Sequence, residues 1–195
     1  MNKINLMGVP VCIDLDGTLV FEETPYPLIK IFFSHYKYFR YTFKLLFYFF
    51  KGRACAKRFL VELVDFKIES LHFNQEVITM AKTFKSKFSS EVYLVTGQDQ
   101  LFAEKILEFL KHENIFKECF GSNGRINLIG KEKTKFLSQH FGEKKFIYVG
   151  NSKQDIPVWQ SSLLAVTVHE KGFSLNHAVS IKRVLYNFCK LLNLS

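Results

Sequence analysis

The sequence predicts an α/β fold built on a doubly wound parallel sheet. Short apolar runs alternate along the chain with longer segments whose apolar residues recur every three to four positions. The short runs are continuously apolar, which is typical of strands covered on both faces. No Gly-, Ser- or Pro-rich linker divides the 195 residues, and 48% of them are hydrophobic, so a sizeable core is expected.

Four apolar runs are the predicted parallel strands. They are residues 9–15 (VPVCIDL), 91–97 (EVYLVTG), 144–150 (KKFIYVG) and 163–169 (LLAVTVH). These runs are rich in β-branched and aromatic residues, and the second and third close on a glycine. A short edge strand is also expected near ECFGS, residues 118–122.

Helices are predicted between these strands. Residues 75–88 and 99–113 have apolar side chains at helical spacing, 131–141 form a shorter helix, and another begins within QDIPVWQ, residues 154–160. Strands that alternate with helices in this way predict helices on both faces of a parallel sheet. The tail, residues 175–195, has the pattern of an amphipathic basic helix, which we expect to pack on the sheet edge.

Residues 22–73 interrupt this alternation and are helical in character. We therefore expect a core formed by 1–21 and 74–195, with 22–73 inserted after the first strand. The insertion has no acidic residue between Thr24 and Val61. It contains eight basic residues there: Lys30, Lys37, Arg40, Lys44, Lys51, Arg53, Lys57 and Arg58. Because the net charge of the chain is +9, the rest of the molecule is close to neutral.

The same insertion is crowded with aromatic residues, and three interpretations stay open. In the first, Phe32, Phe39, Phe43 and Phe47 pack against each other and against the core. In the second, the segment meets an anionic membrane surface, where basic and aromatic residues both contribute. In the third it binds nucleic acid, which is disfavoured because no RNP, KH or helix-turn-helix signature is present.

Polar residues follow the predicted strands at the edge where ligands bind in such a sheet. They are Asp14 and Asp16 after the first strand, Thr96 at the end of the second, Lys133 at a helix start, and Asn151 and Asp155 after the third. Each alone would be a helix cap, a turn residue or a surface lysine. Together they suit phosphoryl transfer. Two aspartates so close together repel, and a bound cation would offset that repulsion.

Four short stretches carry a family resemblance. DLDGTL, YLVTG, GKEK and GNSKQD, in this order, resemble the four motifs of the haloacid dehalogenase-like (HAD) superfamily, over about 9–169. A closer likeness is to the HAD domains fused to UbiA-type prenyltransferases, carried by SNGRINLIG (122–130) and GNSKQDIPVW (150–159). The resemblance implies a Rossmann-like HAD fold in which 22–73 is a helical cap over the active site.

The resemblance also implies a phosphatase that hydrolyses a phosphomonoester through an aspartyl-phosphate intermediate. Asp14 would be the nucleophile, and Asp16 would be the acid and base that serves the leaving oxygen and then the water. Thr96 and Gly97 would bind the phosphate. Lys133 would bind it too and neutralise charge in the transition state.

The implied cofactor is Mg²⁺, bound by the Asp14 carboxylate, the Asp16 backbone carbonyl, Asn151 and Asp155 together with water. Many family members have an acid at the position of Asn151. An amide brings a ligand oxygen but no charge, so we expect weaker metal affinity here. Asp155 would be a ligand or would orient a metal-bound water.

Some choices remain open at this stage. Lys131 is the alternative to Lys133. The long apolar cap favours an aryl phosphate such as phosphotyrosine, or a lipid-like phosphate, as substrate. The alternative function is a catalytically inactive HAD-fold module recruited to anionic membranes through its basic aromatic cap. A dehalogenase is disfavoured, because haloacid dehalogenases lack the second aspartate, here Asp16.

Composition also suggests where the protein works. The four cysteines have no metal-type spacing and are expected to be free thiols. The first residues lack the apolar stretch of a signal peptide. No stretch has the roughly 18 to 20 apolar residues that a membrane-spanning helix needs. A cytoplasmic protein is expected, with peripheral membrane contact through the cap left open.

Overall fold

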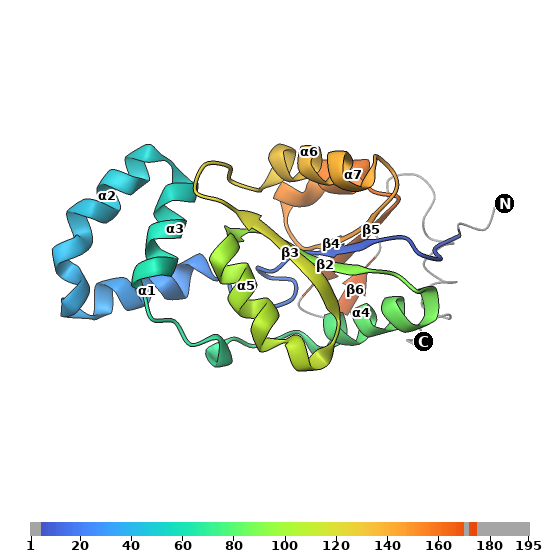
Figure 1. The fold of residues 1–195 in the computed structure, drawn as a ribbon, viewed down its shortest axis with the longest axis horizontal. Coiled ribbons are helices and arrows are strands. Elements are labelled where there is room, and N and C mark those ends of the chain that lie inside the picture. Colours follow the sequence, from blue (N-terminus) through green and yellow to red (C-terminus); the bar gives the residue numbers. More distant parts are fainter. Residues whose placement is uncertain (1–4, 170–171, 175–195) are drawn as a thin grey trace.

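A six-stranded sheet forms the core of the molecule (Figure 1). The computed structural model describes residues 5–169 and 172–174. The strand order is β3-β2-β1-β4-β5-β6. The parallel strands are β1 (Val11–Ile13), β2 (Val92–Asp99), β3 (Phe116–Ser122), β4 (Ile147–Gly150) and β5 (Leu164–His169). The predicted doubly wound parallel sheet is confirmed, and the expected edge strand is β3. The antiparallel β6 (Gly172–Ser174) was not predicted.

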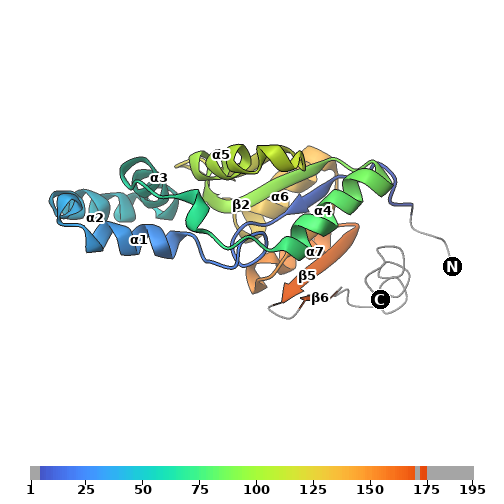
Figure 2. The same cartoon turned by 90° about the horizontal axis from the view of Figure 1, so that it is seen from below.

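Helices cover both faces of the sheet (Figure 2). One face carries α4 (Gln75–Phe88) and α5 (Gln100–Phe109), and the other carries α6 (Gly130–Phe141) and α7 (Ile156–Ser161). A short 3₁₀ turn, η3 (Lys111–Glu113), follows α5, and another, η4 (Lys153–Asp155), precedes α7. The four predicted helices are present, although the second ends at Phe109. The helix predicted over 175–195 lies outside the described residues.

Each central strand is buried on both faces, which explains its continuous apolar pattern. In β1, Val11 and Ile13 pack in the core beneath α4 and α5, while Cys12 joins the smaller core beneath α6 and α7. In β4, Ile147 likewise packs in the core beneath α4 and α5, and Tyr148 packs in the smaller core beneath α6 and α7. Tyr148 is therefore directed toward α6 and α7, and its position matters for the site described below.

The insertion lies between β1 and α4 and projects beyond one end of the sheet (Figure 1). Its elements are α1 (Pro25–Ser34), η1 (Tyr36–Tyr41), α2 (Thr42–Lys51), α3 (Arg53–Leu63) and η2 (Ile68–Ser70). The chain enters and leaves it along adjacent segments, since Phe21 N donates to His72 O at 3.0 Å. A separate domain over 22–73 remains a prediction.

Helix α3 joins the insertion to the core. Lys57 Nζ donates to Gly97 O at 2.6 Å, at the end of β2. The next residue, Arg58, pairs with the buried carboxylate of Asp99 at 3.1 Å. Cys55 Sγ donates to Gly124 O at 2.8 Å. These contacts hold α3 against the carboxyl end of the sheet.

The aromatic residues of the insertion are not all packed. Phe32 is buried, as the packing interpretation expects. That interpretation is wrong for Phe39, Phe43 and Phe47, whose relative exposures are 79%, 86% and 55%. Helix α2 instead packs through its other side, where Leu45 is buried.

The structure bears on two expectations, that the cysteines are free thiols and that no helix is able to span a membrane, for the part of the chain that it describes. Cys12, Cys55 and Cys119 are free thiols, and Cys189 lies outside this part of the chain. Across 5–169 and 172–174, the helices lack the length and apolarity needed to cross a bilayer.

Candidate active site

A cleft of about 230 Å³ opens where the carboxyl ends of β1, β2 and β4 meet the insertion. This is the switch point of the sheet, because β1 is flanked by β2 on one side and β4 on the other. The cleft is lined by Asp14, Asp16, Glu23, Pro25, Arg53, Lys57, Gly97, Asn127, Ile129, Gly130, Lys133, Asn151, Ser152, Gln154 and Asp155. Six of the seven predicted site residues are among them.

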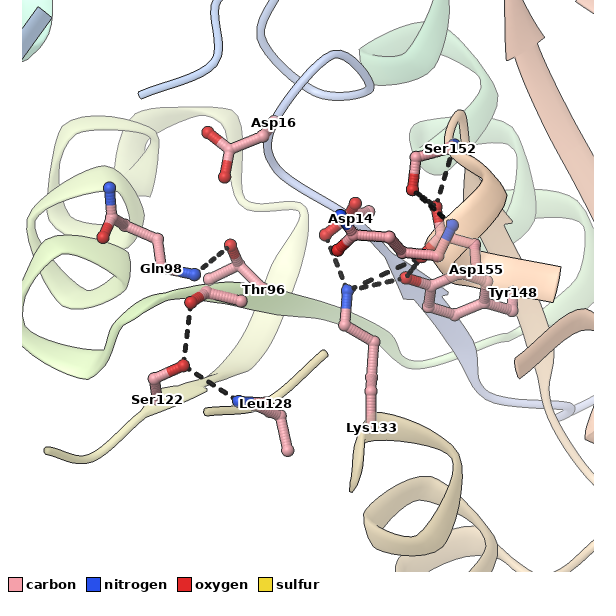
Figure 3. Close-up of polar contacts among 12 residues, drawn as sticks. Asp14, Asp16, Thr96, Gln98, Ser122, Leu128, Lys133, Tyr148, Ser152 and Asp155 are labelled. Carbon is pink, nitrogen blue, oxygen red and sulfur yellow. Dashed lines mark hydrogen bonds and ion pairs between the residues drawn. The ribbon is translucent and has the colours of Figure 1, made fainter. Parts of the chain in front are cut away.

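Asp14 is the first residue after β1 and lies at the base of the site. Its backbone N donates to Val149 O at 2.9 Å, which fixes it beside β4. Its side chain is buried, and Oδ1 accepts a hydrogen bond from Lys133 Nζ at 2.9 Å (Figure 3). Burial raises the pKa of Asp14 to about 7, against the opposing effect of the Lys133 charge.

Lys133 is the cation of the site. It stands near the start of α6 and is only 2% exposed. Besides Asp14, its ammonium donates to Tyr148 Oη at 2.8 Å and lies 3.8 Å from Asp155 Oδ1. The alternative, Lys131, is exposed. The structure therefore brings Lys133 to Asp14 and leaves Lys131 at the surface.

Asp16 is held by the first residues of the insertion. Its Oδ1 accepts from Thr24 N at 2.7 Å and from Thr24 Oγ1 at 2.5 Å. Thr24 Oγ1 in turn accepts from Gln98 Nε2 at 3.0 Å. Burial raises the pKa of Asp16, although the two hydrogen bonds from Thr24 act in the other direction. In Figure 3 its carboxylate lies apart from the Asp14–Lys133 pair.

Asn151 packs directly on Gly17. Gly17 has φ +64°, and a Cβ atom there would lie 2.0 Å from Asn151 Nδ2. Glycine is therefore required for both the backbone conformation and the close approach. Asn151 Oδ1 is buried and has no hydrogen-bond partner among the described residues. An acceptor oxygen left in this state suits coordination of a cation.

Both carboxylate oxygens of Asp155 accept hydrogen bonds from other residues of the protein. Oδ2 accepts from Ser152 N at 3.0 Å and from Ser152 Oγ at 3.1 Å, closing a capping box at η4. Oδ1 accepts from Tyr148 Oη at 2.8 Å. This arrangement suits a residue that orients its neighbours.

Thr96 and Gly97 lie within β2, which is buried along its whole length. Thr96 Oγ1 accepts from Gln98 N at 2.9 Å, and Thr96 does not line the cleft, whereas Gly97 does. A Cβ on Gly97 would lie 2.3 Å from Ile129 Cγ2, so glycine lets the loop before α6 approach. A role for Thr96 in phosphate binding stays a prediction.

Several residues of the site were missed by sequence reasoning. Tyr148 sits inside an ordinary apolar strand pattern. Thr24 has the pattern of a cap for α1, yet it makes no cap hydrogen bond because it binds Asp16. Lys57 is one of eight basic residues between Thr24 and Val61, and nothing in its spacing marks it as the one that reaches Gly97.

The donor set fits a hard divalent cation. Asp14 offers a carboxylate and Asn151 offers its unpartnered Oδ1, and Asp16, whose backbone carbonyl is the expected ligand, also lines the cleft. Oxygen donors are those that Mg²⁺ prefers, and this ion usually keeps several waters. Across the described residues no cluster of three or more His, Cys, Asp or Glu side chains is arranged to hold a metal. A cation here would therefore rely on the amide and water as well as on carboxylates.

No protein-family model matches the chain. A curated relative, the uncharacterised protein y4nM of Sinorhizobium fredii, is 30% identical over 160 residues. The match covers 82% of this chain and 30% of that relative, so the chain spans under a third of the relative's length.

Solved structures with related folds show what the architecture is similar to. A protein of unknown function from Bordetella pertussis matches over 92% of this chain and 95% of its own, with TM-score 0.57 and 13% identity. A HAD family hydrolase from Salmonella enterica matches over 79% and 61%, with TM-score 0.54 and 12% identity. A substrate-bound phosphoserine phosphatase matches over 80% and 83%, with TM-score 0.52 and 17% identity.

These identities are low, so the likeness concerns the fold. None of the three carries a description that bears on the UbiA-fused domains, and that likeness stays a prediction. The matches extend over most of this chain, with TM-scores above 0.5. The chain has the fold of the HAD-superfamily hydrolases.

Proposed function

We propose that this protein is a Mg²⁺-dependent phosphatase that hydrolyses a phosphomonoester through an aspartyl-phosphate on Asp14. The observation that carries the proposal is the buried Asp14–Lys133 pair, joined at 2.9 Å at the end of β1. A carboxylate buried beside a lysine, and open to a cleft, is placed to receive a phosphoryl group.

The proposed reaction has two displacements. An Asp14 carboxylate oxygen bonds to phosphorus while the bond to the leaving oxygen breaks, and Asp16 supplies the proton that this oxygen takes up. Asp16 then accepts a proton from water as water displaces Asp14 from phosphorus. The raised pKa of Asp16 supports its first role, since a protonated carboxyl is needed there. Lys133 neutralises charge on the transferring group.

The metal would be held by Asp14, Asp16 and Asn151. When bound, Mg²⁺ would offset the repulsion between the carboxylates and the phosphate. Asp155 would act on the metal site indirectly, by orienting Ser152 and Tyr148, because its own oxygens already accept hydrogen bonds from these two residues.

The lining of the cleft bears on the substrate. The insertion contributes Arg53, Lys57 and Glu23, and none of the described residues that line the cleft is aromatic. Among the described residues, neither Arg53 nor Lys57 forms an ion pair with a carboxylate. This favours a small leaving group that carries a further anionic group, and it weighs against the aryl or lipid-like ester expected from the apolar cap.

Hydrolysis of p-nitrophenyl phosphate, with and without Mg²⁺, tests the proposed reaction. Turnover should require the metal and should be lost in Asp14→Asn. Asp65→Asn, which changes an exposed acid in the same way, should keep it. Metal-dependent turnover by pure Asp14→Asn protein would remove Asp14 as the nucleophile.

A comparison of substrates tests the leaving group. O-phosphoserine, the substrate class named for one structural neighbour, adds a carboxylate and an ammonium to the phosphate. We expect a higher kcat/KM for it than for p-nitrophenyl phosphate. The reverse order would favour the aryl substrate.

An inactive module is the second candidate, and two observations favour keeping it. Asn151 supplies no charge to the metal, and the insertion exposes a basic aromatic surface. A folded protein that binds Mg²⁺ or inorganic phosphate but turns over neither substrate would support this candidate against the phosphatase.

A further inference from the structure

Helix α2 is apolar around most of its circumference, although one side faces solvent. Its inner side packs on α3: Leu45 is buried, and the Tyr48 ring stacks on Phe59 with centroids 4.9 Å apart. Its outer side carries Phe43, Leu46, Phe47 and Phe50, with relative exposures of 86%, 53%, 55% and 84%. A helix that is apolar all round is normally buried, so the outer side lacks a covering surface.

Two further exposed aromatic residues lie in η1, which directly precedes α2. Tyr36 and Phe39, at 95% and 79% exposure, extend the three- to four-residue spacing of the α2 side chains toward the N-terminus. We call these six residues, Tyr36, Phe39, Phe43, Leu46, Phe47 and Phe50, the tip surface. Figure 1 places α2 at the end of the insertion farthest from the sheet. Large apolar side chains that gather in one exposed segment in this way mark interaction sites.

Positive charge surrounds the tip surface. Its basic residues are Lys37, Arg40, Lys44 and Lys51, and each lies over an aromatic ring at 4.6 to 5.5 Å. Across the described residues none of the four forms an ion pair with a carboxylate. No acidic residue occurs between Thr24 and Val61. The partner must therefore be anionic and must also cover apolar rings.

We propose that the tip surface docks this protein on a bilayer that contains anionic lipids. The aromatic rings would enter the interface, while the flanking lysines, Lys44 and Lys51 among them, would pair with headgroups. A fluid bilayer accommodates separate projecting rings without needing a complementary shape. A second copy is disfavoured as the partner, because two tip surfaces would bring like charges together.

The tip surface is separate from the cleft. None of its six residues lines the cleft, which meets the insertion at α3 and at the chain before α1. Docking and catalysis can therefore be changed independently, and the docking proposal does not depend on the phosphatase proposal.

Co-sedimentation of the full chain with vesicles tests the proposal. We expect binding to phosphatidylcholine mixed with phosphatidylserine, little binding to phosphatidylcholine alone, and weaker binding as salt rises. In Lys37→Glu/Arg40→Glu/Lys44→Glu, affinity should fall at least about a hundredfold, since each basic residue contributes roughly a factor of five near anionic lipid.

A matched control separates local charge from net charge. Lys105→Glu/Lys135→Glu/Lys145→Glu changes the net charge equally at exposed positions away from the insertion, and it should keep most of the binding. In Phe43→Ser/Phe47→Ser/Phe50→Ser the charge is unchanged, and binding at high salt should be lost. Circular dichroism and the unfolding midpoint verify that each variant is folded.

Three outcomes would overturn the proposal. One is equal binding to anionic vesicles by the wild type and the folded Lys37/Arg40/Lys44 variant. Another is binding to a single-stranded oligonucleotide with none to anionic vesicles. The third is a concentration-dependent dimer, seen by analytical ultracentrifugation, that the aromatic variant abolishes while vesicles bind neither protein.

Discussion

The phenolic oxygen of Tyr148 lies 2.8 Å from Lys133 Nζ and 2.8 Å from Asp155 Oδ1. It accepts a hydrogen bond from the lysine and donates one to the carboxylate. Because Lys133 stands on α6 and Asp155 precedes α7, one side chain of β4 connects the two helices that border the cleft. Tyr148 is a positioning residue for the Asp14–Lys133 pair.

Removing only the hydroxyl, in Tyr148→Phe, should weaken both folding and turnover. Asp155 Oδ1 loses its hydrogen-bond donor in a buried place, which costs about 1–3 kcal/mol of the free energy of unfolding. We expect kcat to fall, because the Lys133 ammonium loses the hydroxyl that orients it, and KM to change little, because Lys133 keeps its contact with Asp14. Urea unfolding and steady-state kinetics measure the two effects. Tyr93→Phe, whose hydroxyl binds Glu91 Oε2 at 2.7 Å, is the matched control. Unchanged stability and kcat in Tyr148→Phe would contradict the positioning role.

The pKa of Asp14 predicts how the metal-free protein responds to pH. Burial raises this pKa from 3.8 to about 7, so between these values the native state holds a proton that the unfolded chain has released. The free energy of unfolding should therefore fall as pH rises through this range. Asp14→Asn should flatten that part of the profile, and Mg²⁺ should restore stability near neutral pH. Urea unfolding at a series of pH values, in chelator and in Mg²⁺, provides the test; the same slope in Asp14→Asn would show that another group is responsible.

Gly17→Ala should disturb the site more than the backbone conformation alone explains. The added methyl group would meet Asn151 Nδ2 at 2.0 Å, so Asn151 must move. Gly8→Ala is the matched control: Gly8 has a similar φ of +70°, and nothing lies within 4 Å of a Cβ there. In both variants the free energy of unfolding should fall by about 1 kcal/mol, because alanine is strained in the left-handed conformation. Only Gly17→Ala should also raise the Mg²⁺ concentration needed for half-maximal turnover, and equal Mg²⁺ requirements would argue against contact with the metal site.

Asn151→Asp should lower the Mg²⁺ concentration that gives half-maximal turnover. The change adds a negative charge at the oxygen that now has no hydrogen-bond partner, and a carboxylate attracts the cation more strongly than an amide. Asn114→Asp adds the same charge at an exposed position and should leave the requirement unchanged. If both variants respond to Mg²⁺ like the wild type, Asn151 is not a ligand.

Lys57→Met should raise KM for O-phosphoserine by about ten- to hundredfold, the value of one hydrogen bond to a charged group. KM for p-nitrophenyl phosphate, which lacks the second anion, should rise less. Arg58→Met is the control, because it breaks a cap–core contact on the same helix without lining the cleft. Equal effects of the two variants on both substrates would assign Lys57 to attachment of the insertion alone.

Parts of the site were predictable because strand ends and helix starts have local signals. Asp14 lies at the end of an apolar run, and the start of a helix after Gly130 narrowed the lysine to Lys131 or Lys133, between which only the family resemblance chose. Tyr148 could not be predicted, because a strand buried on both faces gives no pattern that distinguishes a packing side chain from one whose tip reaches a cleft.

The same limit applies to the insertion. In α2 both the inner Leu45 and the outer Phe43 are apolar, so periodicity does not reveal which side faces the protein. Only the stacking of Tyr48 on Phe59 decides the orientation of the helix. The hydrogen bonds from Thr24 to Asp16 could not be predicted either. They depend on the path of the chain between these two residues, and there Phe21 N is hydrogen-bonded to His72 O, far away in the sequence.

The two ends of the insertion are hydrogen-bonded to each other. Asn74 N donates to Leu19 O at 2.9 Å, next to the bond from Phe21 N to His72 O. A replacement segment of another length could be joined at this seam, because the ends to be joined are already adjacent. It would also have to restore the contacts of Thr24 with Asp16 and of Arg58 with the buried Asp99. Exchange of the insertion at this seam would leave the Asp14–Lys133 pair in place, because both residues lie outside 22–73.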